Sequence, residues 1–369
     1  MKERICFIIQ RYNNGGGTER VLSQIAGGLT KRGYSVSIIS IDKGLEPTFE
    51  TDKRVKLYQL EGAKTLKKNK IARRVSAISD IMITRKRLLR LALEINPQIA
   101  VAVDVVLYHY ADYLRKRMGL KTVCWEHYCL DSRKGALIGY SRRLAVKYAS
   151  LTVVISKGDL KSYKEKFKNA KNLKLIYNPL SAEKILENSA DSKIVAAAGR
   201  LTYQKGFDML LNAWSKVEKE ASDWELRIYG DGEDRDSLLA QAESLGLKGV
   251  RFMGYSENLH REMQKASIFV LSSRYEGFGL VLAEAQAMGL PCVSFDCKEG
   301  PRELIDDGIN GFLAEEGNEA ELGNKLLRLI KNDHLRKSFA ASAGKDLYRF
   351  DAERILDEWE SVLEEIMRD

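Results

Sequence analysis

The sequence predicts an α/β protein made of two doubly wound domains, each a parallel sheet covered by helices. Short β-branched runs alternate with amphipathic stretches along the chain, a pattern typical of such sheets. The alternation restarts after Asn178-Pro179-Leu180, where proline favours a turn. The net charge changes sign at the same place, so we expect domains over residues 1–180 and 181–350.

In the first half, apolar runs predict strands and the amphipathic runs between them predict helices. The expected strands are 5–9, 35–41, 55–60, 99–103, 122–125, 152–155 and 173–177. The expected helices are 18–31, 70–95, 107–118, 137–148 and 157–166. Met1-Lys2-Glu3-Arg4 leads directly into the apolar run 5–9, which is too short for a signal peptide and lacks a small-residue cleavage site, so this run is interpreted as a strand. The odd number of cysteines, with no close pair, favours a reduced cytoplasmic setting.

The second half repeats the same pattern. The expected strands are 194–198, 225–229, 250–253, 268–271, 292–295 and 311–313. The expected helices are 206–218, 233–244, 257–265, 280–288, 318–330, 333–345 and 351–367. The last of them lies in a C-terminal segment, 351–369, that can pack back on the N-terminal domain.

Composition limits the class of protein. The chain has 369 residues, 44% of them hydrophobic, which suits about two domains of roughly 150 residues each. No run reaches the roughly 18 apolar residues that indicate a membrane-spanning helix. The five cysteines form no close Cys-x-x-Cys pair, and the four histidines are scattered. A disulfide framework and a zinc site are therefore not expected.

Charge is divided unevenly between the halves. Residues 1–180 carry 36 Lys and Arg against 15 Asp and Glu, a net charge of +21, whereas 181–369 carry 24 against 36, a net charge of −12. Basic amphipathic helices favour anionic membrane surfaces, so such a surface is an expected partner. A solvated lysine-rich face is the alternative. Nucleic acid is not expected, since no recognition motif accompanies the charge.

The segment Glu276-Gly277-Phe278-Gly279-Leu280 joins a predicted strand to a predicted helix, and Glu284 lies about one turn into that helix. Ligands of open α/β sheets bind at the carboxyl ends of strands, and the N–H groups that begin a helix bind anions. Two carboxylates beside an anion site suit a ligand with phosphate and hydroxyl groups, such as a sugar nucleotide. The alternative is a pair of acids that only complement the helix dipole.

In each half, a further candidate turn follows the first strand. The turn at 14–20 contains Gly15 and Gly16, which let a ligand approach the backbone, and a flexible turn is the alternative. It is neither a G-x-G-x-x-G nor a Walker A sequence. In the second half, Arg200 offers a planar fork and Lys205 a point charge, both suited to phosphate. A structural ion pair is the alternative there.

His127 follows the predicted strand that ends at Trp125. A lone histidine is often structural, but its place at the carboxyl end of a strand favours a functional role. Asp231 and Glu233 lie in another strand–helix turn. Acids are common at such positions, so no metal site is expected from them.

Together these motifs resemble the family 4 glycosyltransferases of the GT-B class over essentially the whole chain. The matching segments are 15–20, 125–127, 199–206, 230–232, 276–284, 289–293 and 310–312. The resemblance implies two Rossmann-like doubly wound domains that face each other across a cleft. The N-terminal domain would bind the acceptor, and the C-terminal domain would bind the nucleotide-sugar.

The resemblance also implies roles for the residues of the motifs. Arg200 and Lys205 would hold the donor diphosphate, and Glu284 would bind the ribose hydroxyls. Glu276 and the backbone over 278–280 would hold the donor sugar and its β-phosphate.

In the N-terminal domain, His127 would orient the sugar, while Gly15 and Gly16 would lie against the donor. The expected catalytic residues are therefore His127, Glu276, Arg200 and Lys205.

The implied reaction retains the anomeric configuration. The motifs contain no obvious carboxylate nucleophile, which fits a front-face route in which the leaving phosphate takes the acceptor proton. Two cations and a helix N-terminus would stabilise the leaving diphosphate, so neither a metal nor another cofactor is expected.

Residues 294–301 resemble bacterial members that assemble surface polysaccharides from UDP-hexoses or UDP-N-acetylhexosamines. The expected acceptor is a glycan, lipid-linked at the inner face of the cell membrane, where the protein would be peripheral. Two alternatives are a sugar-nucleotide epimerase or hydrolase with the same fold, and a membrane-binding protein with a degenerate site.

Overall fold

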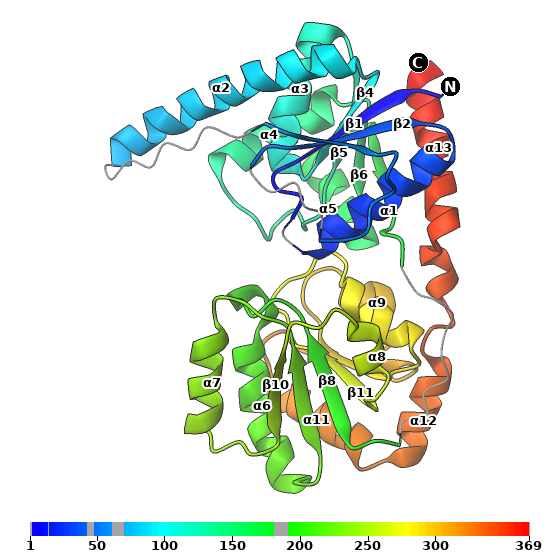
Figure 1. Cartoon of the computed structure of the whole chain (residues 1–369). Helices are drawn as coiled ribbons and strands as arrows, with labels where there is room; N and C mark the ends of the chain where they lie inside the picture. Colours follow the sequence, from blue (N-terminus) through cyan, green and yellow to red (C-terminus); the bar gives the residue numbers. More distant parts are fainter. Residues whose placement is uncertain (1, 14, 43–47, 61–69, 181–190, 369) are drawn as a thin grey trace. The chain divides into compact units, whose positions relative to one another are not determined.

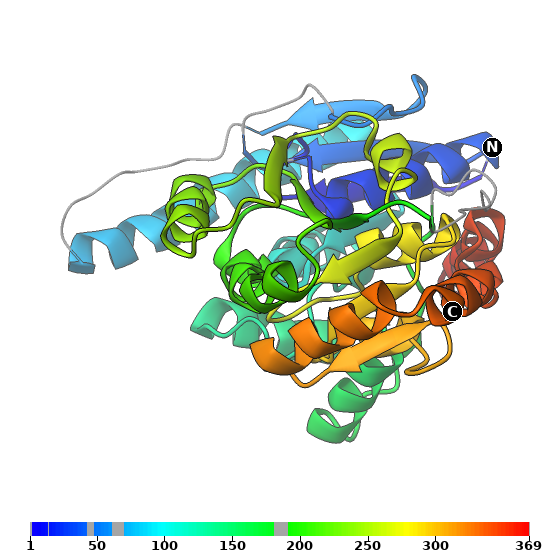
Figure 2. The same cartoon turned by 90° about the horizontal axis from the view of Figure 1, so that it is seen from below.

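The computed structural model describes residues 2–13, 15–42, 48–60, 70–180 and 191–368, and only the backbone of 70–78. It divides into two compact units. Unit 1 comprises Met1–Pro179 with Ala352–Asp369, and unit 2 comprises Leu180–Asp351. Each contains a parallel sheet with helices on both faces (Figures 1 and 2). The prediction of two doubly wound α/β domains is confirmed.

The sheet of unit 1 has the strand order β3-β2-β1-β4-β5-β6-β7. Its strands are β1 (Arg4–Ile9), β2 (Ser35–Ser40), β3 (Lys56–Gln59), β4 (Ile99–Val103), β5 (Lys121–Trp125), β6 (Leu151–Val154) and β7 (Leu173–Leu175). Its helices are α1 (Gly17–Lys31), α2 (Lys70–Ile95), α3 (Tyr108–Met118), α4 (Ala136–Tyr148), α5 (Lys157–Lys166) and α13 (Ala352–Arg368). The chain reverses direction across the sheet between β1 and β4, which creates a switch point there.

The sheet of unit 2 has the order β10-β9-β8-β11-β12-β13. Its strands are β8 (Ile194–Ala198), β9 (Glu225–Tyr229), β10 (Val250–Gly254), β11 (Ile268–Leu271), β12 (Cys292–Phe295) and β13 (Gly311–Ala314). Its helices are α6 (Phe207–Glu220), α7 (Arg235–Ser244), α8 (Leu259–Met263), α9 (Leu280–Ala287), α10 (Pro301–Leu304), α11 (Glu319–Ile330) and α12 (Asp333–Ser342). The switch point lies between β8 and β11.

Helix starts follow the polar residues in the sequence. Ser156 caps α5 by accepting a hydrogen bond from the Asp159 N–H at 3.0 Å. Asn318 and Asn332 cap α11 and α12 in the same way, at 3.1 and 2.9 Å. Such side chains satisfy N–H groups that the helix leaves without a partner, which fixes where each helix begins.

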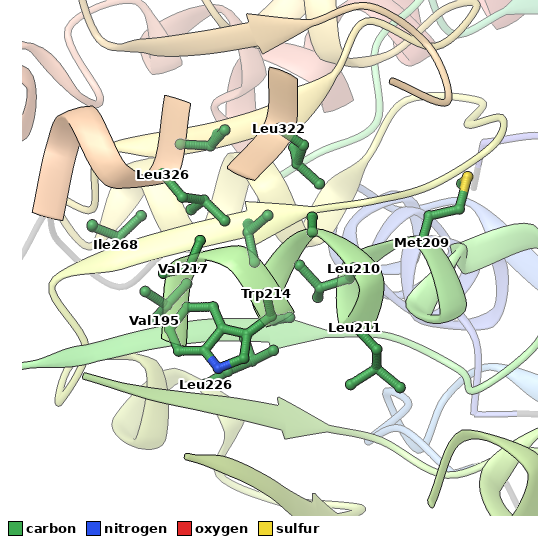
Figure 3. Close-up of a cluster of buried hydrophobic side chains, with 14 of the residues drawn as sticks. Val195, Met209, Leu210, Leu211, Trp214, Val217, Leu226, Ile268, Leu322 and Leu326 are labelled. Carbon is green, nitrogen blue, oxygen red and sulfur yellow. The ribbon is translucent and has the colours of Figure 1, made fainter. Parts of the chain in front are cut away.

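The core of unit 2 is centred on Trp214 of α6, which is fully buried. Figure 3 shows this ring among apolar side chains from β8, β9, β11 and α11. Because the core lies between the sheet and its helices, the carboxyl ends of β8 and β11 are left to carry polar loops.

Helix α13 belongs to unit 1 and runs beside α1 (Figure 1, red and blue). Gly28 of α1 permits this approach, since a Cβ there would lie 2.4 Å from Leu356 Cδ1. Arg32 pairs with Glu353, Asp357 and Glu360 of α13, at 2.8, 2.6 and 3.1 Å. The C-terminal segment is thus attached to the N-terminal domain by packing and by charge.

Candidate functional site

Lys205 and Glu276 meet at the switch point of unit 2. Lys205 follows β8 and Glu276 follows β11, and their Nζ and Oε1 atoms are 2.6 Å apart. Ser273 also donates a hydrogen bond to Glu276 Oε1, at 2.6 Å. The Glu276 side chain is only 7% exposed. The structure therefore brings together two residues predicted for the site, and adds Ser273, which sequence reasoning did not select.

Close backbone packing places Lys205. Gly206 has φ +62°, and a Cβ there would lie 2.2 Å from the carbonyl oxygen of Ser272. The Ser272 hydroxyl in turn donates a hydrogen bond to the Lys205 carbonyl at 2.9 Å. Glycine at 206 thus lets the turn after β8 lie directly on the end of β11, which directs Lys205 at Glu276.

The glycines at 230 and 232 pack against the loop that carries Arg200. A Cβ at Gly230 would lie 1.9 Å from the Gly199 carbonyl oxygen, and one at Gly232 would lie 2.3 Å from the Leu201 carbonyl oxygen. Arg200 itself is exposed. This turn is therefore a packing element, and no group of three His, Cys, Asp or Glu suited to a metal occurs in the described ranges.

The turn after β11 leads into α9. Gly279, at φ +85°, is the residue before the helix, and Leu280 is its first residue. Phe278 is buried and its ring lies 4.9 Å from that of Phe350. The first N–H groups of a helix have no carbonyl partner within it, so this end suits an anion.

Glu284 lies on α9 with its side chain 2% exposed. His260 of α8 approaches it, with Nε2 3.8 Å from Oε1, which is too long for a hydrogen bond. His260 was not among the predicted site residues, because its short helix carries no motif.

In unit 1, the turn after β1 contains Gly15, at φ +65°, and Gly16, which precedes α1. The Gly16 N–H donates to the Glu19 carboxylate at 3.1 Å. Across the switch point, Asp104 follows β4 with φ +96° and pairs with Arg133. A non-glycine residue in this region is strained, and sequence reasoning gave no signal for it.

His127 follows β5 and is 6% exposed. Its ring lies 4.4 Å from the Trp125 ring, and burial lowers its pKa to about 3. The neighbouring Glu126 is fully buried and accepts hydrogen bonds from the Tyr163 hydroxyl at 2.9 Å and the Tyr128 N–H at 3.2 Å. The histidine is therefore neutral near pH 7, on a loop held by a buried carboxyl group.

This burial predicts a pH dependence of stability. The folded pKa of His127 lies below the ordinary value of 6.5, so the folded state binds fewer protons between about pH 3 and 6.5. The stability from the neutral ring is present above about pH 6.5 and is lost as pH falls towards 3. Replacing His127 with glutamine should flatten the fall of Tm between about pH 7 and 4.

The matched control is His334→Gln, because His334 is exposed on α12. Its Tm should follow that of the parent across the same pH range. A His127→Gln profile as steep as the parent profile would contradict the prediction.

Comparison with known proteins gives the family. Residues 15–184 match the sequence model described as Glycosyltransferase Family 4, and residues 181–346 match that of Glycosyl transferases group 1. An uncharacterized glycosyltransferase of Haemophilus influenzae is 31% identical over 366 residues, covering 98% of this chain and 100% of that protein. The chain belongs to the family 4 glycosyltransferases. The family expected from the motifs is confirmed.

Two other similar proteins extend the comparison. An N-acetylgalactosaminyltransferase of Campylobacter jejuni, whose name specifies a glycan-PP-undecaprenol substrate, is 29% identical over 98% of this chain and 99% of its own. The crystal structure of HepE from Anabaena, in complex with UDP and glucose, superposes with a TM-score of 0.82 at 21% identity. It covers 98% of this glycosyltransferase and 100% of HepE, so the two share the GT-B fold.

Proposed function

We propose that this glycosyltransferase moves a hexose or N-acetylhexosamine from a UDP-sugar to a glycan acceptor, with retention of configuration, in the assembly of a bacterial surface polysaccharide. The observation that carries the proposal is the Lys205–Glu276 pair at the unit 2 switch point, between two strand ends and beside the start of α9. It combines a cation for phosphate, a carboxylate for sugar hydroxyls and helix N–H groups for an anion.

Donor binding would change the partners of these groups. The Glu276 carboxylate is paired with the Lys205 ammonium. A diphosphate carries more negative charge than one carboxylate, so it would attract the Lys205 ammonium and the Arg200 guanidinium. Glu276 would then accept hydrogen bonds from the sugar, and Glu284 from the ribose. Gly15, Gly16 and the backbone over 278–280 would approach the donor.

Stabilisation of the leaving diphosphate would accelerate the transfer step. Breaking the glycosyl–phosphate bond leaves negative charge on the diphosphate, which two cations and the α9 N-terminus would stabilise. In a front-face route the leaving phosphate would take the proton of the acceptor hydroxyl. The neutral His127 ring could accept or donate a hydrogen bond to the sugar without adding charge.

The test is a screen of UDP-, GDP- and dTDP-sugars for turnover, with and without a glycan acceptor. The proposal requires transfer that depends on both a UDP-sugar and the acceptor, with the product anomer determined by NMR. Release of UDP at the same rate without an acceptor would instead identify a hydrolase or epimerase.

Replacing Arg200 or Lys205 with alanine should weaken the binding of UDP much more than that of uridine. A phosphate left without its cation costs about 1–3 kcal/mol, a roughly 5- to 150-fold loss of affinity. Calorimetric titration with UDP and uridine measures the difference. Lys193→Ala is the control, since Lys193 is exposed and pairs with Asp223. Equal losses for UDP and uridine would mean that Arg200 and Lys205 do not contact the diphosphate.

Transfer in EDTA should match transfer in magnesium or manganese. The two cations proposed for the diphosphate replace the charge that a divalent ion would supply. Initial rates after exhaustive chelation, with and without added metal, provide the measurement. A strict requirement that added metal restores would contradict this and make Asp231 and Glu233 candidate ligands.

We also propose that the acceptor is lipid-linked and that the protein is peripheral at the inner membrane face. No helix in the described ranges is both long and apolar enough to cross a membrane. Tyr148 is 39% exposed, and the cationic groups of Arg115 and Lys147 lie 5.0 Å from its ring. Exposed rings among cations suit an anionic surface.

The sequence also has a basic cluster at Lys67, Lys68, Arg73 and Arg74, of which Lys67 and Lys68 lie outside the described residues. The side chains of Arg73 and Arg74 also lie outside them. Salt-sensitive sedimentation with anionic liposomes tests the membrane proposal, and no sedimentation at low salt would reject it.

A further inference from the structure

Trp125 and His127 extend from the same face at the end of β5, because side chains two residues apart in an extended chain share a face. Their ring centroids are 4.4 Å apart with an interplanar angle of 47°. Phe7 of β1 lies on this face too, 6.4 Å from Trp125. The histidine ring therefore rests on a buried aromatic group.

Trp125 also contacts Trp359 of α13. The two indole centroids are 4.8 Å apart, in an edge-to-face arrangement with an angle of 67°. Both indoles are fully buried. The last helix of the chain thus contributes to the same stack as His127, although 232 residues separate the two positions in the sequence.

Helix α13 can fix this indole firmly. Its buried side chains form one stripe along the helix, namely Ile355, Leu356, Trp359, Val362, Leu363 and Ile366. The ion pairs of Arg32 and the close contact of Gly28 with Leu356 hold the helix on α1. Trp359 is therefore placed by contacts on both sides of it along the helix.

Hydrogen bonds do not explain the orientation of the stack. Within the described part of the chain, His127 Nε2 and both indole Nε1 atoms are buried without a hydrogen-bond partner. The rings are consequently held by packing, and aromatic pairs have preferred offset and edge-to-face geometries. Replacing one indole should therefore change the orientation of the ring packed against it.

We propose that Trp359 is a positioning residue for glycosyl transfer: through Trp125 it sets the orientation of the His127 imidazole. This inference rests on the role proposed above for His127. Trp359 would contact neither donor nor acceptor, and the charged side chains proposed to hold UDP lie in unit 2. Loss of the indole should therefore lower kcat while leaving UDP affinity unchanged.

The experiment compares Trp359→Ala and the milder Trp359→Phe with Ile366→Ala, which removes a buried side chain of α13 two turns away. The full chain contains four histidines, so ¹³C-labelled histidine gives four ring signals, and His127→Gln identifies the one from His127. A neighbouring indole shifts such a signal strongly. We expect the His127 signal to move in both Trp359 variants and to stay in place in Ile366→Ala.

Transfer rates complete the test. Misplacement of a group by about 1 Å can cost about 100-fold, so kcat should fall about 10- to 100-fold in Trp359→Ala and less in Trp359→Phe. The UDP Kd should match that of the parent. Ile366→Ala should keep the parental kcat at a temperature where all variants are folded.

The outcomes separate this inference from the proposed function. An unmoved His127 signal in both Trp359 variants overturns the inference, whatever the rates. A moved signal with parental kcat in those variants, together with an impaired His127→Gln, also overturns it. A fully active His127→Gln would instead overturn the role proposed for His127, and with it any effect of Trp359 on transfer.

Discussion

Glu276→Gln is expected to bind UDP nearly as well as the parent and to transfer sugar roughly 100- to 1,000-fold more slowly. The carboxylate is buried and accepts hydrogen bonds from Lys205 and Ser273, so it is already oriented before a ligand binds. Glutamine keeps the shape and one acceptor oxygen but removes the charge. Lys205 is then free to pair with the diphosphate, which preserves UDP affinity, whereas the hydrogen bonds proposed for the sugar weaken.

The measurement pairs a UDP titration with initial rates of transfer. Glu225→Gln is a matched control, since Glu225 is also ion-paired, with Arg227 at 2.8 Å, but lies at the start of β9. That end of the strand is opposite the ligand-binding edge of a parallel sheet. Full activity in Glu276→Gln would remove this residue from the site.

The elements of the fold could be predicted because their signals are local. The strand at 99–103 is a run of five buried apolar residues, and the prediction matches β4 at both ends. The helices at 70–95 and 157–166 were also predicted to the residue. By contrast, the prediction of a helix over 257–265 was too long, since α8 spans only Leu259–Met263. A sequence with few capping signals defines such ends poorly.

Contacts within the candidate site were less predictable, because they join distant segments. Lys205 and Glu276 were each selected for a ligand, yet 71 residues separate them and nothing local shows that they pair. The contact of Trp359 with Trp125 depends on how α13 folds back onto unit 1. Ser273 and His260 were missed because a single polar residue near a strand end or in a short helix has no distinctive pattern.

The glycine pair at 230 and 232 is another case in which a contact between distant segments could not be predicted. Its spacing was noticed as a motif, but the reason for it is the carbonyl oxygens of another loop. Glycine is required at both positions because there is no space for a Cβ. At 230 it is also required because the backbone φ angle is +132°. That distinction can be tested by substitution.

Gly230→Ala is expected to destabilise unit 2 by several kcal/mol and to lower its Tm by about 10 °C. The new Cβ would overlap the Gly199 carbonyl oxygen, from which it would lie only 1.9 Å away, and φ +132° adds backbone strain. The carbonyl oxygen belongs to the backbone and cannot rotate away as a flexible side chain would. The two loops must therefore separate. The loop so displaced carries Arg200, so UDP affinity should fall as well.

Two other glycines divide this effect into its parts. Gly246 has φ +68° and nothing within 4 Å of an added Cβ, so Gly246→Ala introduces backbone strain alone, at about 1–2 kcal/mol. Gly232 lacks a positive φ but would place a Cβ 2.3 Å from the Leu201 carbonyl oxygen, so Gly232→Ala introduces the steric conflict alone. If loop packing positions Arg200, thermal melts with and without UDP should show weakened UDP stabilisation for the variants at 230 and 232, and parental stabilisation for Gly246→Ala. Parental UDP stabilisation in all three variants would mean that the contact between these loops supports the fold of unit 2 but not the placement of Arg200.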